Sequence, residues 1–264
     1  MQYNPFRNIY FFPNFKTGHV IQWTVDPLLK EPLPYVFTLE ASGTPDFKVI
    51  EYSIVGGDVY TITDNTNFKQ SLASDLFYRV KLTTRAPSVY YSRTVSFGAG
   101  VNSRRKYRLA SEITRKELLL SRKFTGIQGW VLKRKAFGAV AMDSVDEISG
   151  VPIVDNTSNF GTEFEGGYYD PLAIMFSIEE YQQTRKQSED GNGVIEQDLY
   201  KIRMAGFPVL DTFDVLVDDT GGRCFVIKDQ QQDFFPGTDI TVSQTLQTQL
   251  VAITDPIYQI VIPR

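Results

Sequence analysis

The chain has 264 residues, of which 42% are hydrophobic and 22% charged, and its formal net charge is −4. This composition is typical of a globular protein and excludes a disordered or collagen-like chain. The single cysteine, Cys224, and the single histidine, His19, exclude an intrachain disulfide and a zinc site built from Cys and His. We expect a chain kept in a reducing cytosol, with Cys224 buried and His19 an ordinary, partly buried histidine.

The first residues are rich in aromatic side chains and lack the charged start and apolar run of a signal peptide. No stretch approaches the roughly 18 apolar residues of a membrane span, so we expect no membrane contact. The five aromatic side chains of this segment are too apolar to remain in water without a partner. We therefore expect residues 1–15 to form an N-terminal arm that packs on a neighbouring subunit, through Phe6, Tyr10, Phe11, Phe12 and Phe15.

Residues 16–88 alternate between apolar and polar side chains, and clusters of Pro and Gly interrupt the alternation. The expected strands cover residues 19–25, 35–39, 47–55, 59–63 and 76–83. Short strands at this spacing predict a small antiparallel sandwich. Trp23 on an early strand, followed by Tyr78-Arg-Val-Lys-Leu82 on a late one, resembles a fibronectin type III domain.

A connecting segment over residues 89–165 contains one convincing helix, at residues 104–122. The helix has no Gly or Pro and places Leu109, Ile113, Glu117 and Leu120 on one stripe. Eleven Lys and Arg residues stand against two Glu residues between Ser103 and Lys135. We therefore expect a helix that lies on a scaffold and leaves a basic face available.

Residues 166–264 return to a β pattern and predict a small closed barrel or sandwich. The expected strands cover residues 168–177, 206–210, 214–217, 222–227, 238–249 and 257–262, with a loop or hairpin tip at 182–192 and a tight turn at 218–222. The fold class is thus mainly β. Between Asp143 and Asp219, seventeen acidic residues stand against four basic ones, an acidic block that complements the basic helix.

No arrangement of residues points strongly to catalysis. The carboxylate pairs are adjacent in sequence rather than placed across a cleft, as a glycosidase needs. Calcium could bind Asp211, Asp214, Asp218 and Asp219, but the spacing of a calcium loop is missing. There is no phosphate-binding or dinucleotide glycine motif. We expect no enzyme activity, no cofactor and no metal.

Two motifs resemble a family of tailed-bacteriophage virion proteins. One runs from Arg105 through Arg122-Lys-Phe-Thr-Gly126 to Trp130-Val-Leu-Lys-Arg-Lys-Ala-Phe-Gly138. The other is Phe160-Gly-Thr-Glu-Phe-Glu-Gly-Gly-Tyr-Tyr169. The family carries paired cysteines that would fall near 140–143 and at Asn156 and Asn159, so the resemblance implies a zinc knuckle that has lost its metal ligands. In their place we expect Asp155, Asn156 and Thr157 to hold the turn.

The strand candidates at 214–226 and 257–262 also resemble those of small β-barrel head-closure proteins of phages. Together the resemblances imply a structural subunit of a virion, assembled in the host cytoplasm: a neck or head-to-tail connector component. Its partners would be portal, neck and tail subunits and further copies in a ring, with transient contact to genomic DNA possible. The expected interface residues are Phe6, Tyr10, Phe11, Phe12, Arg104, Arg105, Arg108, Arg115 and Trp130.

Two alternatives from other classes remain open. The sandwich and the aromatic residues permit a carbohydrate- or host-receptor-binding module of a phage tail, since aromatic rings stack on sugars. A cell-wall hydrolase is the other alternative, and it would depend on the carboxylate pairs described above.

Overall fold

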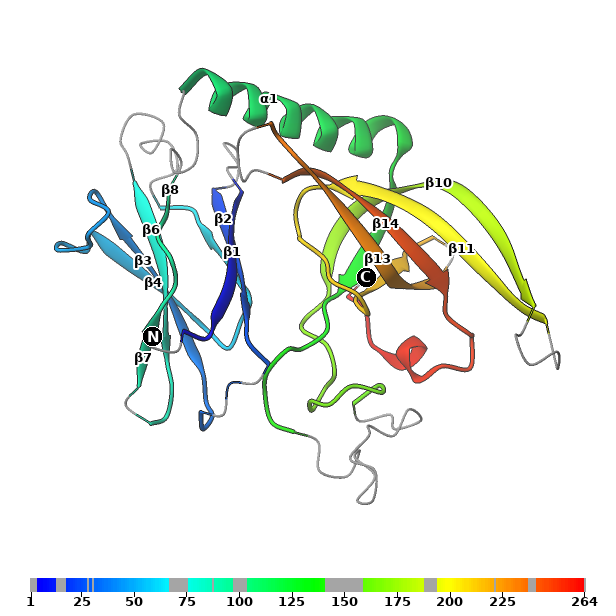
Figure 1. Ribbon diagram of the computed structural model, residues 1–264, viewed down its shortest axis with the longest axis horizontal. Helices are drawn as coiled ribbons and strands as arrows, with labels where there is room; N and C mark the ends of the chain where they lie inside the picture. The colour runs from blue at the N-terminus through cyan, green and yellow to red at the C-terminus, as the bar shows by residue number, and fades with distance from the viewer. Residues whose placement is uncertain are drawn as a thin grey trace. The chain divides into compact units, whose positions relative to one another are not determined.

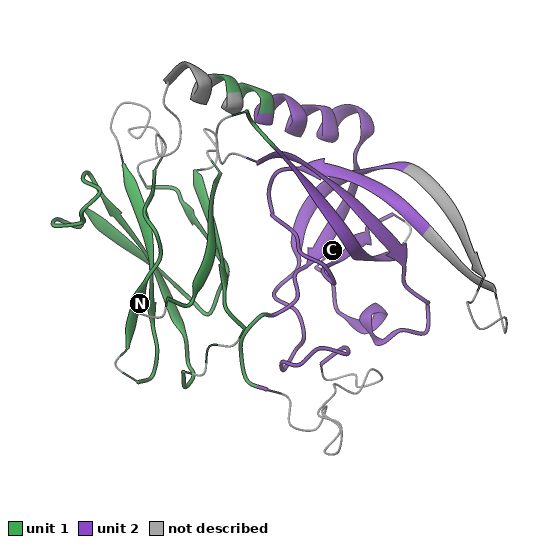
Figure 2. Ribbon diagram, in the orientation of Figure 1, with its two compact units in different colours: residues 1–113, 136–139, 234–240 green, residues 114–135, 140–233, 241–264 purple. Residues whose placement is uncertain are grey.

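A computed structural model shows a mainly β protein in which half of the residues lie in strands (Figure 1). The structure describes residues 4–12, 18–27, 29, 31–66, 76–86, 88–96, 104–140, 159–187, 194–220, 222–236 and 241–263. Side chains are not described at residues 104–108, 110–111, 180–187 and 194–198. The chain forms two compact units (Figure 2): unit 1 has residues 1–113, 136–139 and 234–240, and unit 2 has residues 114–135, 140–233 and 241–264.

Unit 1 contains the sandwich predicted from the sequence. One antiparallel sheet has the order β1-β2-β5, and the other has the order β4-β3-β6-β7, with β8 also paired to β6. The strands are β1 (Phe6–Phe12), β2 (His19–Val25), β3 (Val36–Ser42), β4 (Tyr52–Gly57), β5 (Thr61–Asp64), β6 (Phe77–Thr83), β7 (Val89–Tyr91) and β8 (Val95–Ser96).

Alternation along the strands produces the core between these two sheets. On β6, Tyr78, Val80 and Leu82 are fully buried, whereas the residues between them are partly exposed. The Trp23 ring of β2 packs on Phe37 of β3, with 5.2 Å between ring centroids. Trp23 and Tyr78, the two residues behind the fibronectin-like expectation, therefore both lie in the core.

The expectation of a separate N-terminal arm is wrong for residues 6–12. These residues form β1, an edge strand that pairs with β2 from Phe6↔Val25 to Phe12↔Val20. Phe12 is buried, the Phe6 ring meets Phe37, and the Phe11 ring stacks on His19 and Tyr78. The aromatic side chains thus complete the core of their own sandwich. The rest of the expected arm, residues 1–3 and 13–15, lies outside the described residues.

The expected domain boundaries also change. β7 and β8 belong to the sandwich, so unit 1 extends beyond residue 88, and residues 136–139 join it because Phe137 packs on Tyr35 and Phe37. The barrel begins well before residue 166, because it includes residues 127–132. The described residues of the expected connecting segment, 89–96, 104–140 and 159–165, are divided between the two units.

Unit 2 is built on a closed barrel of the strand order β10-β11-β14-β13-β12-β9. Its interior is filled by apolar side chains, among them Phe176, Ile202, Phe225 and Leu246. The strands are β9 (Ile127–Leu132), β10 (Leu172–Gln187), β11 (Val194–Ala205), β12 (Val215–Asp218), β13 (Cys224–Phe234) and β14 (Thr241–Leu250). Closure leaves the barrel body without an open sheet edge.

Two expected strands in unit 2 are not strands. Residues 206–210 are an irregular segment held by the fully buried Gln244, whose amide donates to Ala205 O and Pro208 O and accepts from Leu210 N. Residues 256–259 form a short 3-10 helix, η4 (Pro256–Gln259), which the Asp255 side chain caps. A loop or hairpin tip is expected at residues 182–192. Residues 182–187 instead continue β10, and residues 188–193 lie outside the described residues.

The predicted helix is present as α1 (Arg104–Leu120), followed by the π turn η2 (Ser121–Thr125). Among the described residues, no helix combines the length and the apolar character that crossing a membrane requires. The boundary between the two units falls within α1, after Ile113.

The buried carboxylate of Asp64 organises the middle of the sandwich. It accepts hydrogen bonds from the hydroxyls of Tyr52, at 2.6 Å, and Tyr78, at 2.7 Å, and from the backbone amide of Thr66. Burial and this carboxylate together raise the pKa of both hydroxyls above the usual tyrosine value, so both remain protonated donors.

We expect Tyr78→Phe to lower the free energy of unfolding by about 1.5–3 kcal/mol, because the buried Asp64 loses a charge-assisted hydrogen bond. Tyr52→Phe is the matched control and should cost less, since Tyr52 is only half buried. Urea unfolding of the intact chain measures both. Because the pKa of both tyrosines is raised on folding, the wild type should also lose stability as the pH rises above about 10. Equal stability of Tyr78→Phe and wild type would contradict this account.

Deletion of residues 1–15 removes β1, so we expect it to destabilise the sandwich rather than only impair assembly. Ile9 and Phe12 are buried, and each contributes roughly 1.5–3 kcal/mol of burial. Thermal unfolding followed by near-ultraviolet circular dichroism tests this expectation. A truncated chain that melts like the wild type would restore the idea of an independent arm.

Candidate functional site

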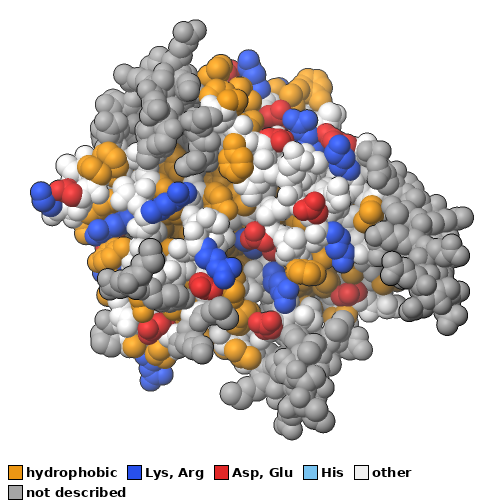
Figure 3. All heavy atoms as spheres, in the orientation of Figure 1, with side chains coloured by type: hydrophobic (Ala, Val, Ile, Leu, Met, Phe, Trp, Pro, Cys, Tyr) orange, Lys and Arg blue, Asp and Glu red, His pale blue; other side chains and the backbone are white. Residues whose placement is uncertain are grey.

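The exposed side chains of α1 and η2 form the most distinctive surface of unit 2. Four large apolar residues and four cations are exposed within ten positions. We call this the α1–η2 surface, and its members are Arg115, Lys116, Leu118, Leu119, Leu120, Arg122, Lys123 and Phe124. Phe124 is 73% exposed, far more than an aromatic ring in a core. Figure 3 shows hydrophobic and cationic side chains interleaved along the upper edge, where α1 runs.

The opposite side of α1 faces the barrel within unit 2. Glu117, which interrupted the predicted apolar stripe, forms an ion pair with Arg203 of β11 at 3.1 Å. Ile113 and Glu117 are partly buried as that stripe required, but Leu109 and Leu120 at its ends are exposed. The charged residue in the stripe therefore tethers the helix, and its pair is half exposed, so it contributes at most about 1 kcal/mol.

The Arg122-Lys-Phe-Thr-Gly126 motif forms most of the π turn η2 and the glycine that ends it. The Gly126 amide donates to the carbonyl of Ser121 at 2.8 Å, which ends the helix with an i to i−5 bond. A Cβ at position 126 would lie 2.2 Å from that carbonyl oxygen, so only glycine fits. The turn directs the chain into β9 and leaves Arg122, Lys123 and Phe124 exposed. Single π turns occur frequently at functional sites.

The Phe160–Tyr169 motif folds into a compact turn beside the residues that follow β9. Asn159, one of the positions where the resembling family has a cysteine, is fully buried. Its amide donates to the carbonyl of Thr162, whose hydroxyl donates back to Asn159 O. Lys135 then anchors the turn through bonds to Glu165 O and Gly167 O. Side-chain to backbone bonds hold this frame, whereas Asp155, Asn156 and Thr157 lie outside the described residues.

A buried ion pair lies at the end of β9. The strand register sets Lys133 beside Asp214, because Leu132 pairs with Val215. The Lys133 ammonium lies 2.9 Å from both Asp214 Oδ2 and Asp211 Oδ2. The Asp214 carboxylate also accepts from the backbone amides of Arg134 and Asp211, each at 2.8 Å. Lys133 and Asp214 are both buried, and Asp211 is about half exposed.

The charges of this group compensate each other. Burial acts against the charge on Lys133, but Asp214 and Asp211 outweigh it and raise the pKa of the ammonium above its usual value. Burial raises the pKa of the Asp214 carboxyl, and Lys133 and the backbone amide of Asp211 oppose that shift. Lys133 therefore occupies the place that a bound cation would take between these carboxylates.

The remaining ionisable side chains considered from the sequence serve the fold. Asp218 is buried, accepts from the amide of Thr220 and pairs with Arg223 at 2.8 Å, which confirms the tight turn. His19 is fully buried against Phe11. Burial raises the pKa of Cys224 to about 11, so its thiol stays protonated. Among the described residues, no three His, Cys, Asp or Glu side chains are grouped to hold a metal.

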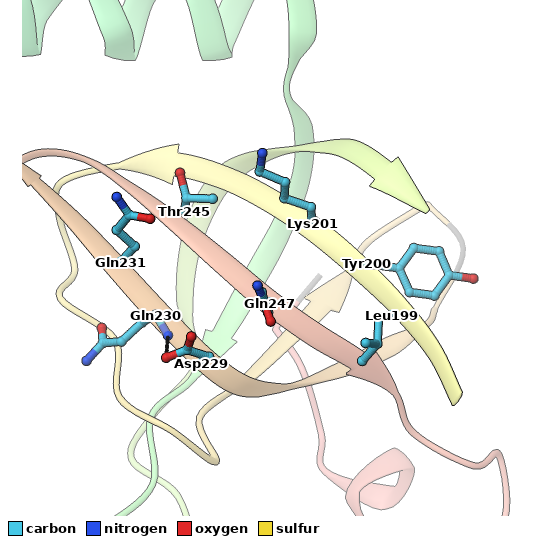
Figure 4. A pocket seen from close by; sticks show the side chains of 8 residues that line it. All are labelled: Leu199, Tyr200, Lys201, Asp229, Gln230, Gln231, Thr245 and Gln247. Atoms are coloured by element: carbon cyan, nitrogen blue, oxygen red, sulfur yellow. Dashed lines mark hydrogen bonds between the residues drawn. The ribbon is translucent and has the colours of Figure 1, made fainter. Parts of the chain in front are cut away.

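A shallow groove crosses the outer face of β11, β14 and β13 (Figure 4). Its volume is about 280 Å³, slightly below the roughly 300–1,000 Å³ of small-molecule sites. Lys201, Thr245 and Gln231 point to the same side of the sheet. The other lining residues are Leu199, Tyr200, Asp229, Gln230 and Gln247. The groove can offer hydrogen bonds but lacks the apolar walls of a typical ligand pocket.

The structure separates the expected interface residues into three groups. Phe6, Tyr10, Phe11 and Phe12 lie on β1 of the sandwich. Trp130 lies on β9, packed against the barrel cluster that includes Leu132 and Val217, so its place is structural. Arg115 is exposed on α1, as expected, while Arg104, Arg105 and Arg108 lie in α1 with side chains outside the described set.

The expected interface residues did not include Leu118 and Leu119, which the structure shows to be exposed. Sequence reasoning also missed the pair of Lys133 and Asp214, whose members are 81 positions apart. Comparison of the chain with models of known protein families gave no match, and neither did comparison with curated proteins.

We expect Lys133→Met to lower the free energy of unfolding by about 3–5 kcal/mol, because it leaves the buried Asp214 carboxylate without its counter-charge. Asp211→Asn is the matched control and should cost no more than about 1 kcal/mol, since Asp211 is half exposed. Urea denaturation of the full chain measures both. If Lys133→Met unfolds at the wild-type midpoint, the pair does not stabilise the barrel.

Proposed function

We propose that the chain is a structural subunit of a tailed-phage virion, most simply a neck or head-to-tail connector component. The observation that carries this proposal is the α1–η2 surface. Four large apolar side chains exposed among four cations need a protein partner, because monomeric proteins rarely expose such a patch. The same segment carries the motif by which the sequence resembles the phage family, and Gly126 has a steric reason to be in it.

Charge within unit 2 supports assembly from several copies. The cations of the α1–η2 surface lie within residues 115–123, whereas the described exposed acids are spread over the remainder of the unit. A second copy therefore offers a complementary surface, in a heterologous contact of the kind that closes rings. The exposed acids are Glu163, Glu165, Asp170, Glu179, Asp211, Asp219, Asp229 and Asp233.

A structural rather than catalytic role fits the buried ionisable groups. Asp64, Lys133, Asp214 and Asp218 each bond to neighbours that hold the fold together. None of these groups lies in the groove on the outer face of the barrel. The proposed partners are portal, neck and tail subunits and further copies of the chain, within a virion assembled in the host cytoplasm.

The second candidate, a carbohydrate- or host-receptor-binding module, is favoured by one observation. The groove over β11, β14 and β13 presents amide, hydroxyl and carboxylate groups that can form hydrogen bonds with a sugar. Its small volume and shallow form favour the connector role. Saturable binding to a glycan array, lost in Gln247→Ala, would reverse this preference.

We expect the double variant Leu119→Ser and Phe124→Ser to lose binding to portal rings and to itself while folding normally. Surface substitutions usually change stability by less than about 0.5 kcal/mol, so the thermal midpoint should remain near that of the wild type. Ile253→Ser with Val261→Ser is the matched control, because both residues are more than 80% exposed in the same unit. Light scattering of the chain alone and mixed with purified portal rings measures assembly.

Assembly that persists in the Leu119 and Phe124 variant would contradict the proposed surface. DNA is the competing partner of the cations, and salt separates the two cases. DNA binding falls steeply with salt in proportion to the phosphates neutralised. A contact with a desolvated apolar component should be weakened much less by the same salt.

A further inference from the structure

The hairpin of β10 and β11 extends beyond the barrel that it helps to close. β10 spans 16 residues and β11 spans 12. β9 pairs with β10 only over residues 172–176, and β14 pairs with β11 only over 199–205. The pairing of β10 with β11 continues further, to Gln187↔Val194. We call residues 180–187 and 194–198 the distal ribbon.

Within the described chain, no third strand pairs with the distal ribbon. An isolated two-stranded ribbon is only marginally stable in water, and its outer edges expose backbone donors and acceptors. A register shift between Ile178 and Glu180 marks where the ribbon leaves the barrel, and such bulges bend a strand. The ribbon is therefore an extension of the closed barrel that has two open edges among the described strands.

The two edges of the ribbon carry opposite charge. Arg185 and Lys186 lie on the β10 edge, where Glu180 is the single acid among residues 180–187. Glu196 and Asp198 lie on the β11 edge, and residues 194–198 contain no base. Within one chain, the strand register already sets Arg185 opposite Glu196 across the hairpin. A second copy that offers its β11 edge to the open β10 edge repeats this favourable pairing, whereas pairing of two β11 edges sets like charges together.

We propose that the distal ribbons of neighbouring copies pair edge to edge, β10 of one copy with β11 of the next, in an antiparallel intermolecular sheet. This inference rests on the proposed function, which requires several copies in a ring. Rotation about an axis along the ribbon brings each β10 antiparallel to the next β11, so the contact is heterologous and closes. Backbone hydrogen bonds supply the attraction, as in other cases of strand addition, and the edge charges select β10 for β11.

Single cysteine substitutions in separate chains test this pairing. One chain carries Thr184→Cys on β10, and a second, tagged chain carries Gln197→Cys on β11. These positions face each other within one hairpin, so placing them in different chains excludes an intrachain bridge. The native Cys224 stays in place, because it is buried and its raised pKa makes it unreactive. The tagged and untagged chains are mixed, allowed to assemble and oxidised mildly.

We expect mixed disulfide dimers in about tenfold excess over dimers of like chains. Ile195→Cys tested against Thr184→Cys, and Lys186→Cys tested against Gln197→Cys, cover registers shifted by two residues in either direction. All of these positions lie on strand edges that β9 and β14 leave open. Ile253→Cys, an exposed position outside the ribbon, is the control that should give no preferred product.

The outcomes separate this inference from the proposed function. Like-chain dimers as the main product would replace the heterologous contact with a two-fold one and overturn the inference. Rings observed by light scattering without a cross-link in any of the three pairs of positions would also overturn it and leave the connector role intact. A chain that remains monomeric when alone overturns the inference as well, and binding to portal rings then decides the connector role by itself.

Discussion

Closure of the barrel by β9 is the constraint on which the rest of unit 2 depends. β9 pairs with β10 on one side and β12 on the other, so a single short strand joins the first and last strands of the sheet. Gly129 makes this possible, because a Cβ there would lie 2.3 Å from the carbonyl oxygen of Val217 and 2.5 Å from the Phe176 ring. The neighbouring strand and the core ring approach so closely that no side chain fits between them.

The candidate surfaces are arranged around that strand. The π turn η2 leads directly into β9, so the exposed Phe124 lies only a few residues before the strand that closes the barrel. Lys133 follows β9 directly and reaches Asp214 because the register of β9 with β12 sets the two side by side. The first residues of β10 pair with β9, and its last residues belong to the distal ribbon.

Each unit contains a buried carboxylate that lies in the core because neighbouring groups donate hydrogen bonds to it. In the sandwich, two tyrosine hydroxyls and one amide surround Asp64. In the barrel, Lys133 and two amides surround Asp214. A buried charge costs several kcal/mol of desolvation, so each is tolerated only with its partners present.

Local patterns in the sequence determined much of the secondary structure. The alternation of Phe77–Thr83 predicted β6, the run without Gly or Pro predicted α1, and the cluster at Asp218–Gly222 predicted the turn before β13. These elements follow from contacts between residues close in the chain, which is why their periodicity is readable. The basic character of the helix was also visible from the sequence alone, because it depends only on composition.

Only the tertiary structure decided how distant segments meet. The apolar residues 6–12 fit either an external arm or a core strand, and pairing with β2 selected the strand. The apolar residues 206–210 had a strand-like pattern, but Gln244 satisfies their backbone groups in place of a sheet ladder. No local pattern relates Lys133 to Asp214, and barrel closure places their charged groups 2.9 Å apart. Each of these outcomes depends on long-range packing, which local periodicity does not encode.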